Sequence, residues 1–157
     1  MKLRKNKINE KFIKDNKDLI ITSSLENAKR LHNDAETLIK GESYSSALGL
    51  TIAGLEEIAK ASLIKKNDLS NLDDLVNHRK KAIEIMNLSG ECYKIPTISQ
   101  DRLDWARERI PQMREDSTYV RLKPTQGNKI KPDDNYWRKR TLNLFKFLSD
   151  ILKKIKI

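Results

Sequence analysis

Apolar residues recur every three or four positions along most of the chain, the spacing that places them on one face of an α-helix. No run of alternating apolar and polar residues is long enough to build a sheet. The expected helices cover about residues 24–40, 43–66, 72–88, 100–110 and 133–157. We therefore predict an all-α, single-domain bundle of about five helices with short connections.

Local signals set the expected helix ends. Ser23 followed by Glu26 forms a capping box that would start the first helix, and Gly41 would end it. Gly90, in "NLSGE", would end the third helix. Pro111 is expected to kink or stop the fourth helix, which leaves the following "QMREDSTYVRL" partly extended.

The second helix carries apolar residues on two sides, so we expect it to be the central helix of the bundle. One face holds Leu48, Ile52, Leu55, Ala59 and Leu63, and the opposite face holds Leu50, Ala53, Ala61 and Ile64.

Two adjacent carboxylates interrupt this helix in the stretch "GLEEIAKASLIKK". The periodicity places Glu57 within the second apolar face and Glu56 on a narrow polar strip with Lys60. A buried carboxylate needs partners, and Lys60 alone is not enough for Glu57. The expected polar cluster is completed by residues near apolar stripes of other helices: His78, Lys81, Arg114 and Tyr119. His78 is either a hydrogen-bonded packing residue, the more frequent use of such a histidine, or a proton-transfer group.

Charge is concentrated at the two ends of the chain. The net charge is +10 over 157 residues, with +4 in residues 1–18, +8 in residues 121–157 and −2 between them. The cations Arg138, Lys139 and Arg140 are candidates for nucleic-acid contacts, which are strong, salt-dependent and blind to sequence. A highly charged surface that serves solubility is the alternative.

The rest of the composition excludes several classes of protein. Cys92 is the only cysteine, which excludes an internal disulfide framework, and no cysteines and histidines stand at zinc spacing, so we expect no metal and no cofactor. The longest apolar run near the N-terminus, residues 19–21, is far too short for a signal or membrane segment. A cytoplasmic protein that does not enter the membrane is expected.

The run "NAKRLHNDAETLIKGESYSSALGLTIAGLEEIAKA", with "HRKK" and "MREDSTYV" further on, resembles the AbiV family of bacterial abortive-infection proteins over about residues 22–121. The residues that carry the resemblance are Asn27, Ala28, Leu31, Asp34, Ala35, Tyr44, Ala47, Glu56, Glu57, Lys60, His78, Lys81, Arg114, Glu115 and Tyr119. The resulting division is a basic N-terminal extension (1–21), a HEPN-like helical core (22–121), a loop (122–132) and a basic amphipathic helix that packs on the core (133–157).

This resemblance implies phage defence by abortive infection and a relationship to the HEPN superfamily. Many HEPN proteins are dimeric, metal-independent ribonucleases with an arginine and a histidine four to six residues apart on one helix. No arginine lies within the ten residues before His78, so that motif is absent here.

Two functions from different classes remain open. The favoured one is binding of a phage or host macromolecule, with RNA or a translation component and a phage protein as the expected partners. The alternative is a divergent ribonuclease in which His78 is general acid or base, Arg114 or Lys81 stabilises the phosphorane charge, and Glu57 orients the histidine. A homodimer is expected because the central helix has two apolar faces and the C-terminal helix is long and amphipathic, which would leave apolar surface exposed in one chain, and because the resemblance implies one.

Overall fold

The computed structural model describes residues 11–67, 76–118 and 134–154. Their main elements are the helices α2 (Lys17–Lys40), α3 (Tyr44–Lys65), α5 (His78–Tyr93), α6 (Gln100–Thr118) and α7 (Asp134–Lys154). The described residues form no strand, which confirms the prediction of an all-α bundle. None of the helices in these three ranges combines the length and apolar character needed to cross a membrane.

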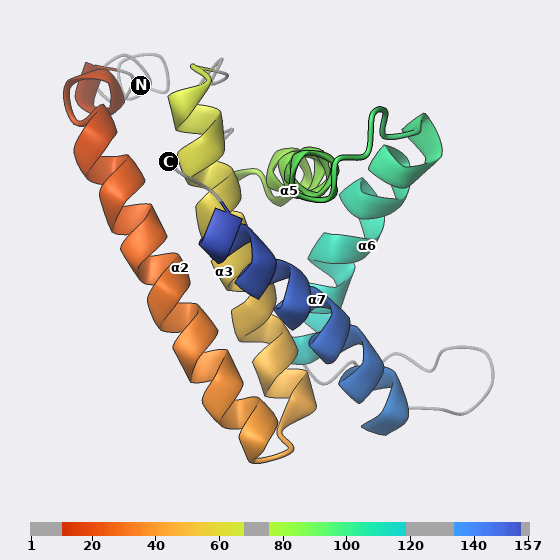
Figure 1. The fold of residues 1–157 in the computed structure, drawn as a ribbon. Coiled ribbons are helices and arrows are strands. Elements are labelled where there is room, and N and C mark those ends of the chain that lie inside the picture. The colour runs from red at the N-terminus through yellow and green to blue at the C-terminus, as the bar shows by residue number, and fades with distance from the viewer. Residues whose placement is uncertain (1–10, 68–75, 119–133, 155–157) are drawn as a thin grey trace, which may run out of the picture.

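Helix α3 is the centre of the bundle, as its two apolar faces predicted. It contacts each of α2, α5, α6 and α7. In Figure 1, α2 runs alongside α3 on one side, α5 and α6 lie on the other, and α7 crosses α3. Both apolar faces of α3 are therefore used within one chain, so the homodimer expectation now depends on the family resemblance alone.

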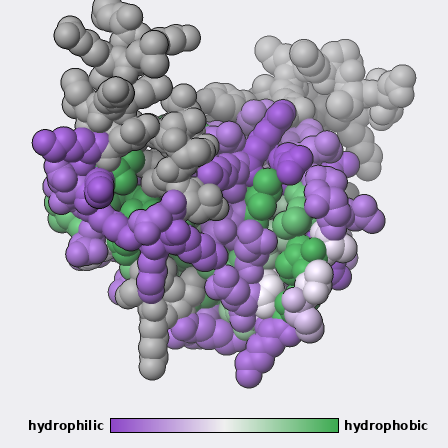
Figure 2. Space-filling model, turned by 90° about the horizontal axis from the view of Figure 1, so that it is seen from above, coloured by the Kyte–Doolittle hydropathy of each residue, from purple (hydrophilic) through white to green (hydrophobic). Residues whose placement is uncertain are grey.

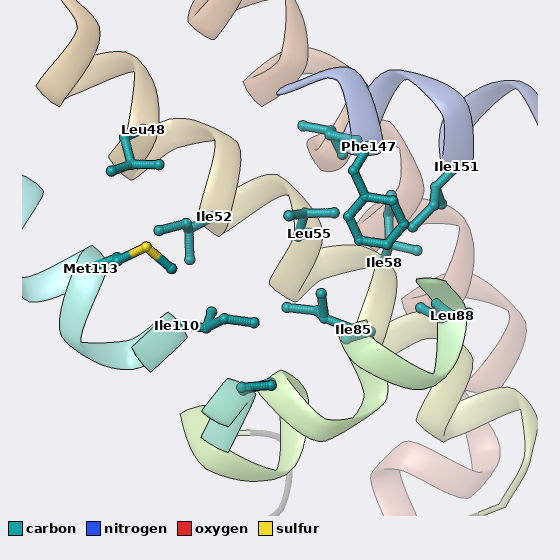
Figure 3. Close-up of a cluster of buried hydrophobic side chains, with 14 of the residues drawn as sticks. Leu48, Ile52, Leu55, Ile58, Ile85, Leu88, Ile110, Met113, Phe147 and Ile151 are labelled. Carbon is teal, nitrogen blue, oxygen red and sulfur yellow. The ribbon is translucent and has the colours of Figure 1, made fainter. Parts of the chain in front are cut away.

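The core forms where α3 meets α5, α6 and α7 (Figure 3). Its fully buried side chains include Leu48, Ile52, Leu55, Ile58, Ile85, Leu148 and Ile151. Gly54 lets α7 approach α3 closely, because a Cβ atom there would lie only 3.0 Å from Cδ2 of Leu148. Seen from above, the described surface is mainly hydrophilic, with separate hydrophobic areas (Figure 2).

Several predicted helix ends are wrong. Helix α2 starts at Lys17 instead of beside the capping box at Ser23, because Ser24 is buried against the bundle and helical packing continues N-terminal to it. The third helix is described from His78, after an Asn77 cap whose side chain accepts hydrogen bonds from the backbone N–H groups of Arg79 and Lys80. The earlier part of the predicted span, residues 72–75, lies outside the described residues.

Gly90 and Pro111 do not end their helices. Helix α5 continues past Gly90 to Tyr93, and Gly90 serves packing, since a Cβ atom there would lie 3.1 Å from the side chain of Ile98. Helix α6 continues through Pro111 to Thr118, so the predicted extended structure is wrong for residues 112–118. Proline removes one backbone hydrogen bond, and the burial of Ile110 and Met113 on either side of it favours continuing the helix.

Candidate functional site

The side chain of Glu56 is almost completely buried on α3, with 6% of its surface exposed. Its carboxylate contacts one basic residue at the start of α5, a second one turn later, and a third near the end of α6. We call Glu56, His78, Lys81 and Arg114 the Glu56 cluster. Three helices that are far apart in sequence therefore meet at one charged group.

Both carboxylate oxygens of Glu56 have basic partners. Oε1 lies 2.8 Å from Nδ1 of His78, while Oε2 accepts hydrogen bonds from Nζ of Lys81 at 3.3 Å and Nη1 of Arg114 at 3.0 Å. His78 and Lys81 are three residues apart on α5, so both side chains reach the same face of α3. This arrangement supplies the charge and the hydrogen bonds that a buried carboxylate requires.

Arg114 also contacts the imidazole of His78. Its Nη1 lies 2.8 Å from Nδ1 and 3.0 Å from Nε2 of the ring. In the tautomer with its proton on Nδ1, His78 donates to Glu56 and keeps Nε2 as an acceptor for the guanidinium. The cluster thus brings together an arginine and a histidine that are 36 residues apart in the chain.

The members of the cluster differ in exposure. Lys81 is buried with Glu56, whereas the side chains of His78 and Arg114 are 46% and 37% exposed. The buried pair anchors the cluster to α3, and the side chains of His78 and Arg114 are partly accessible to solvent.

The predicted roles of the two adjacent carboxylates are reversed. Glu57, with 22% of its side chain exposed, pairs with Lys60 of its own helix, with Nζ and Oε2 2.5 Å apart. Within the described ranges, no hydrogen bond or ion pair joins it to His78 or Arg114. Glu56 lies four residues after Ile52 and three before Ala59, so it shares a helix face with these two apolar residues and with Leu63. This position explains why Glu56 is buried. Helices α5 and α6 approach α3 on the side of Glu56, and the periodicity of α3 alone could not show which helices lie on which side.

The other predicted site residues that the structure describes are separate from this cluster. Lys60 belongs to the Glu57 pair, and Tyr119 lies outside the described residues. On α7, Arg138 and Lys139 are exposed. Arg140 stacks over the ring of Tyr136, with its guanidinium carbon 4.4 Å from the ring centre, and its Nη1 lies 3.7 Å from Sδ of Met113 on α6.

A second buried carboxylate, Glu84 on α5, was missed by the sequence analysis. It accepts a hydrogen bond from Oγ of Ser62 at 2.5 Å and another from Nζ of Lys66 at 2.9 Å, both on or just after α3. Lys66 also reaches Glu91 at 3.2 Å. Burial lowers the pKa of Lys66, but hydrogen bonds and charge attraction from Glu84 and Glu91 outweigh it, so the pKa is raised.

A sequence signal for Glu84 existed. It lies three residues after Lys81 and four before Leu88, on the inner face of α5. Glu84 thus occupies the same kind of inner helix position on α5 that Glu56 occupies on α3.

Comparison with known proteins agrees with this geometry. The family model for AbiV, of the HEPN type, matches residues 19–134, well over half of the chain. The searches against curated proteins and against solved structures gave no significant match. The matched range includes α3, α5, α6 and all but the first two residues of α2, and with them all four members of the Glu56 cluster. The chain therefore belongs to the AbiV family of HEPN proteins, a membership that implies a role in abortive infection against phage.

Proposed function

We propose that this AbiV-family protein acts in phage defence by binding RNA, with the Glu56 cluster as a phosphate-contacting site. The observation that carries the proposal is a buried carboxylate that holds two half-exposed basic groups, His78 and Arg114, in fixed positions. A guanidinium presents a planar set of N–H donors that matches the oxygens of a phosphate. Because Glu56 already orders both side chains, a bound phosphate costs little additional side-chain entropy.

Exposed cations on α7 also favour RNA as the partner. Arg138 and Lys139 are exposed, and the contact between Arg140 and Met113 connects this part of α7 to α6. Such cations contribute affinity that does not depend on RNA sequence and that falls as salt rises. A phage protein remains the alternative partner, with a binding surface that need not respond to salt in this way.

The test is RNA binding by fluorescence anisotropy, at salt concentrations from 50 to 200 mM. We expect binding to weaken steeply over this range, and the double variant R138E/K139E to bind several-fold more weakly than the wild-type protein. The matched control is K29E/R30E on α2, which changes the net charge equally on a different helix. Equal losses in the two double variants, or binding that does not respond to salt, would contradict the proposal.

A second candidate function, metal-independent RNA cleavage, is favoured by the Glu56–His78 contact. A carboxylate on Nδ1 orients an imidazole whose Nε2 can exchange a proton with a ribose 2′-hydroxyl once a bound phosphate has drawn the guanidinium of Arg114 away from it, and Arg114 then stabilises charge on that phosphate. Here Glu56 takes the orienting role first assigned to Glu57. Arg114 and His78 come from different helices, which explains why no short sequence motif indicates the pair.

Cleavage and binding are separated by one pair of variants. Total RNA and tRNA are incubated with protein in EDTA, and H78A is compared with H32A. His32 is the matched control, because it stacks on Phe145 with ring centres 4.5 Å apart and bonds to Ser149, away from the cluster. Cleavage that H78A alone abolishes, with binding retained, would establish the nuclease. Binding without cleavage in the wild-type protein would leave RNA binding as the function.

A further inference from the structure

Helix α6 carries an exposed tryptophan between two exposed arginines. Trp105 is 44% exposed, and Arg102 and Arg109 lie one turn before it and one turn after it. The steps of three and four residues place the three side chains within about 60° of one another around the helix. The surface therefore combines an accessible aromatic face with two cations, a pairing that suits the bases and phosphates of a nucleic acid.

The two arginines are available to a ligand. Among the residues that the structure describes, neither Arg102 nor Arg109 forms a side-chain hydrogen bond or ion pair. Arg107, on a different side of α6, contrasts with them, since its Nη1 lies 3.5 Å from Asp104. The cations beside Trp105 are therefore the ones left to meet an external anion.

We infer that Trp105, Arg102 and Arg109 form a binding surface for single-stranded RNA. This inference rests on the proposed function and names the form of RNA that is bound. An unpaired base presents a face that stacks on an indole ring, and guanidinium groups one turn on either side can contact the adjoining phosphates. Bases in a duplex are already stacked on their neighbours, so double-stranded RNA gains nothing from Trp105.

Charge determines on which side of Trp105 the strand runs. Asp101 and Glu108 lie on the other side of the tryptophan around the helix, and both are exposed. Their carboxylates repel phosphates, so the backbone follows the side of Arg102 and Arg109. That side continues toward Met113, four residues after Arg109, where Arg140 of α7 makes its contact. The surface thus reaches Arg140 of α7.

The tryptophan fluorescence of the protein provides the probe for the test. Trp105 and Trp137 are its two tryptophans, and Trp137 is buried at 8% exposure in the core. The variant W137F keeps Trp105 as the only tryptophan, and W105F keeps Trp137. We expect a single-stranded oligo(A) 12-mer to quench the fluorescence of W137F, whereas a 12-base-pair RNA duplex leaves it unchanged and W105F responds to neither.

Affinity measurements complete the test in the full-length protein. W105A should bind the single strand at least about fivefold more weakly and the duplex equally well. R109E should weaken binding to the single strand, while its neighbour R107E should have a much smaller effect. RNA binding without quenching of Trp105 would overturn this inference and leave the proposed function intact, whereas no RNA binding at all would overturn both. A W105A protein that changes its oligomeric state but binds RNA normally would instead assign Trp105 to an interface between copies of the chain.

Discussion

Glu56 and Glu84 are both buried carboxylates at the contact between α3 and α5, but their surroundings differ. Glu84 is held by a neutral hydroxyl, Ser62, and by Lys66, and its partners belong to these two helices and their ends. Glu56 is held by three basic side chains from α5 and α6. The first arrangement satisfies a buried charge locally, and the second fixes a half-exposed histidine and arginine at a surface.

The comparison indicates what each carboxylate is for. Lys66, with 43% of its side chain exposed, can turn toward Glu91 or water when Glu84 is absent. Lys81, with 10% of its side chain exposed, has far less access to water without Glu56. Loss of Glu56 should therefore be more damaging than loss of Glu84, and it should also disturb the half-exposed His78 and Arg114, the groups that we propose contact phosphate.

The largest expected effect is that of E56A. It leaves Lys81 buried without its carboxylate, and breaking a buried ion pair by removing one partner typically costs about 3–5 kcal/mol. The control is E57A, which removes a half-buried pair within one helix and should cost less than about 1 kcal/mol. The free energy of unfolding from urea denaturation measures both. Similar values for the two variants would show that Glu56 does not anchor the cluster.

A smaller loss is expected for E84A. Removing this carboxylate leaves the buried hydroxyl of Ser62 without its acceptor, a cost of about 1–3 kcal/mol, while Lys66 keeps Glu91. The double variant S62A/E84A removes the stranded hydroxyl as well and should recover part of the loss. Urea denaturation of the three proteins tests this directly, and a double variant less stable than E84A would contradict it.

The arrangement of the bundle could be predicted from the sequence because α3 carries apolar residues on two faces. A helix with two apolar faces has to be surrounded, and α3 is contacted by the four other main helices. The helix ends were harder to predict, because their signals compete with packing. The capping box at Ser23 and Glu26 lies inside α2, where Ser24 faces the bundle, and Pro111 lies between the buried residues Ile110 and Met113.

The sequence predicted the basic residues of the site but not the carboxylate that they contact. His78, Lys81 and Arg114 were expected to meet a carboxylate of α3, and they do. Choosing between Glu56 and Glu57 required the positions of α5 and α6 around α3, which depend on contacts between helices. Trp105 was missed although a sequence signal existed, since the helical spacing of Leu103, Ala106 and Ile110 already places this tryptophan off the apolar stripe of α6.

The smallest expected effect concerns a carboxylate on the outside of the bundle, Asp150 on α7. It accepts hydrogen bonds from Lys146 at 2.8 Å and from the hydroxyl of Tyr93 at 3.0 Å, and these contacts lower its pKa. Burial and then the bond to Asp150 raise the pKa of Tyr93 from 10.0 to about 12. Tyr93 therefore favours the folded state below pH 10, and this contribution is lost as the pH rises toward 12. Asp150 favours the folded state above about pH 4, and its contribution is lost below that pH.

The variant D150N separates the two causes of the Tyr93 shift. It removes the negative charge beside the hydroxyl but leaves the burial, so the pKa of Tyr93 should fall only part of the way from about 12 toward 10. Absorbance at 295 nm follows tyrosinate formation, and Y93F identifies which of the four tyrosines titrates late. Urea stability at pH 7 should hardly change, since the Asp150–Lys146 pair lies on the surface. A loss at pH 7 as large as that of E84A would show that burial, which Glu56 and Glu84 share, is not what makes a carboxylate of this protein costly to remove.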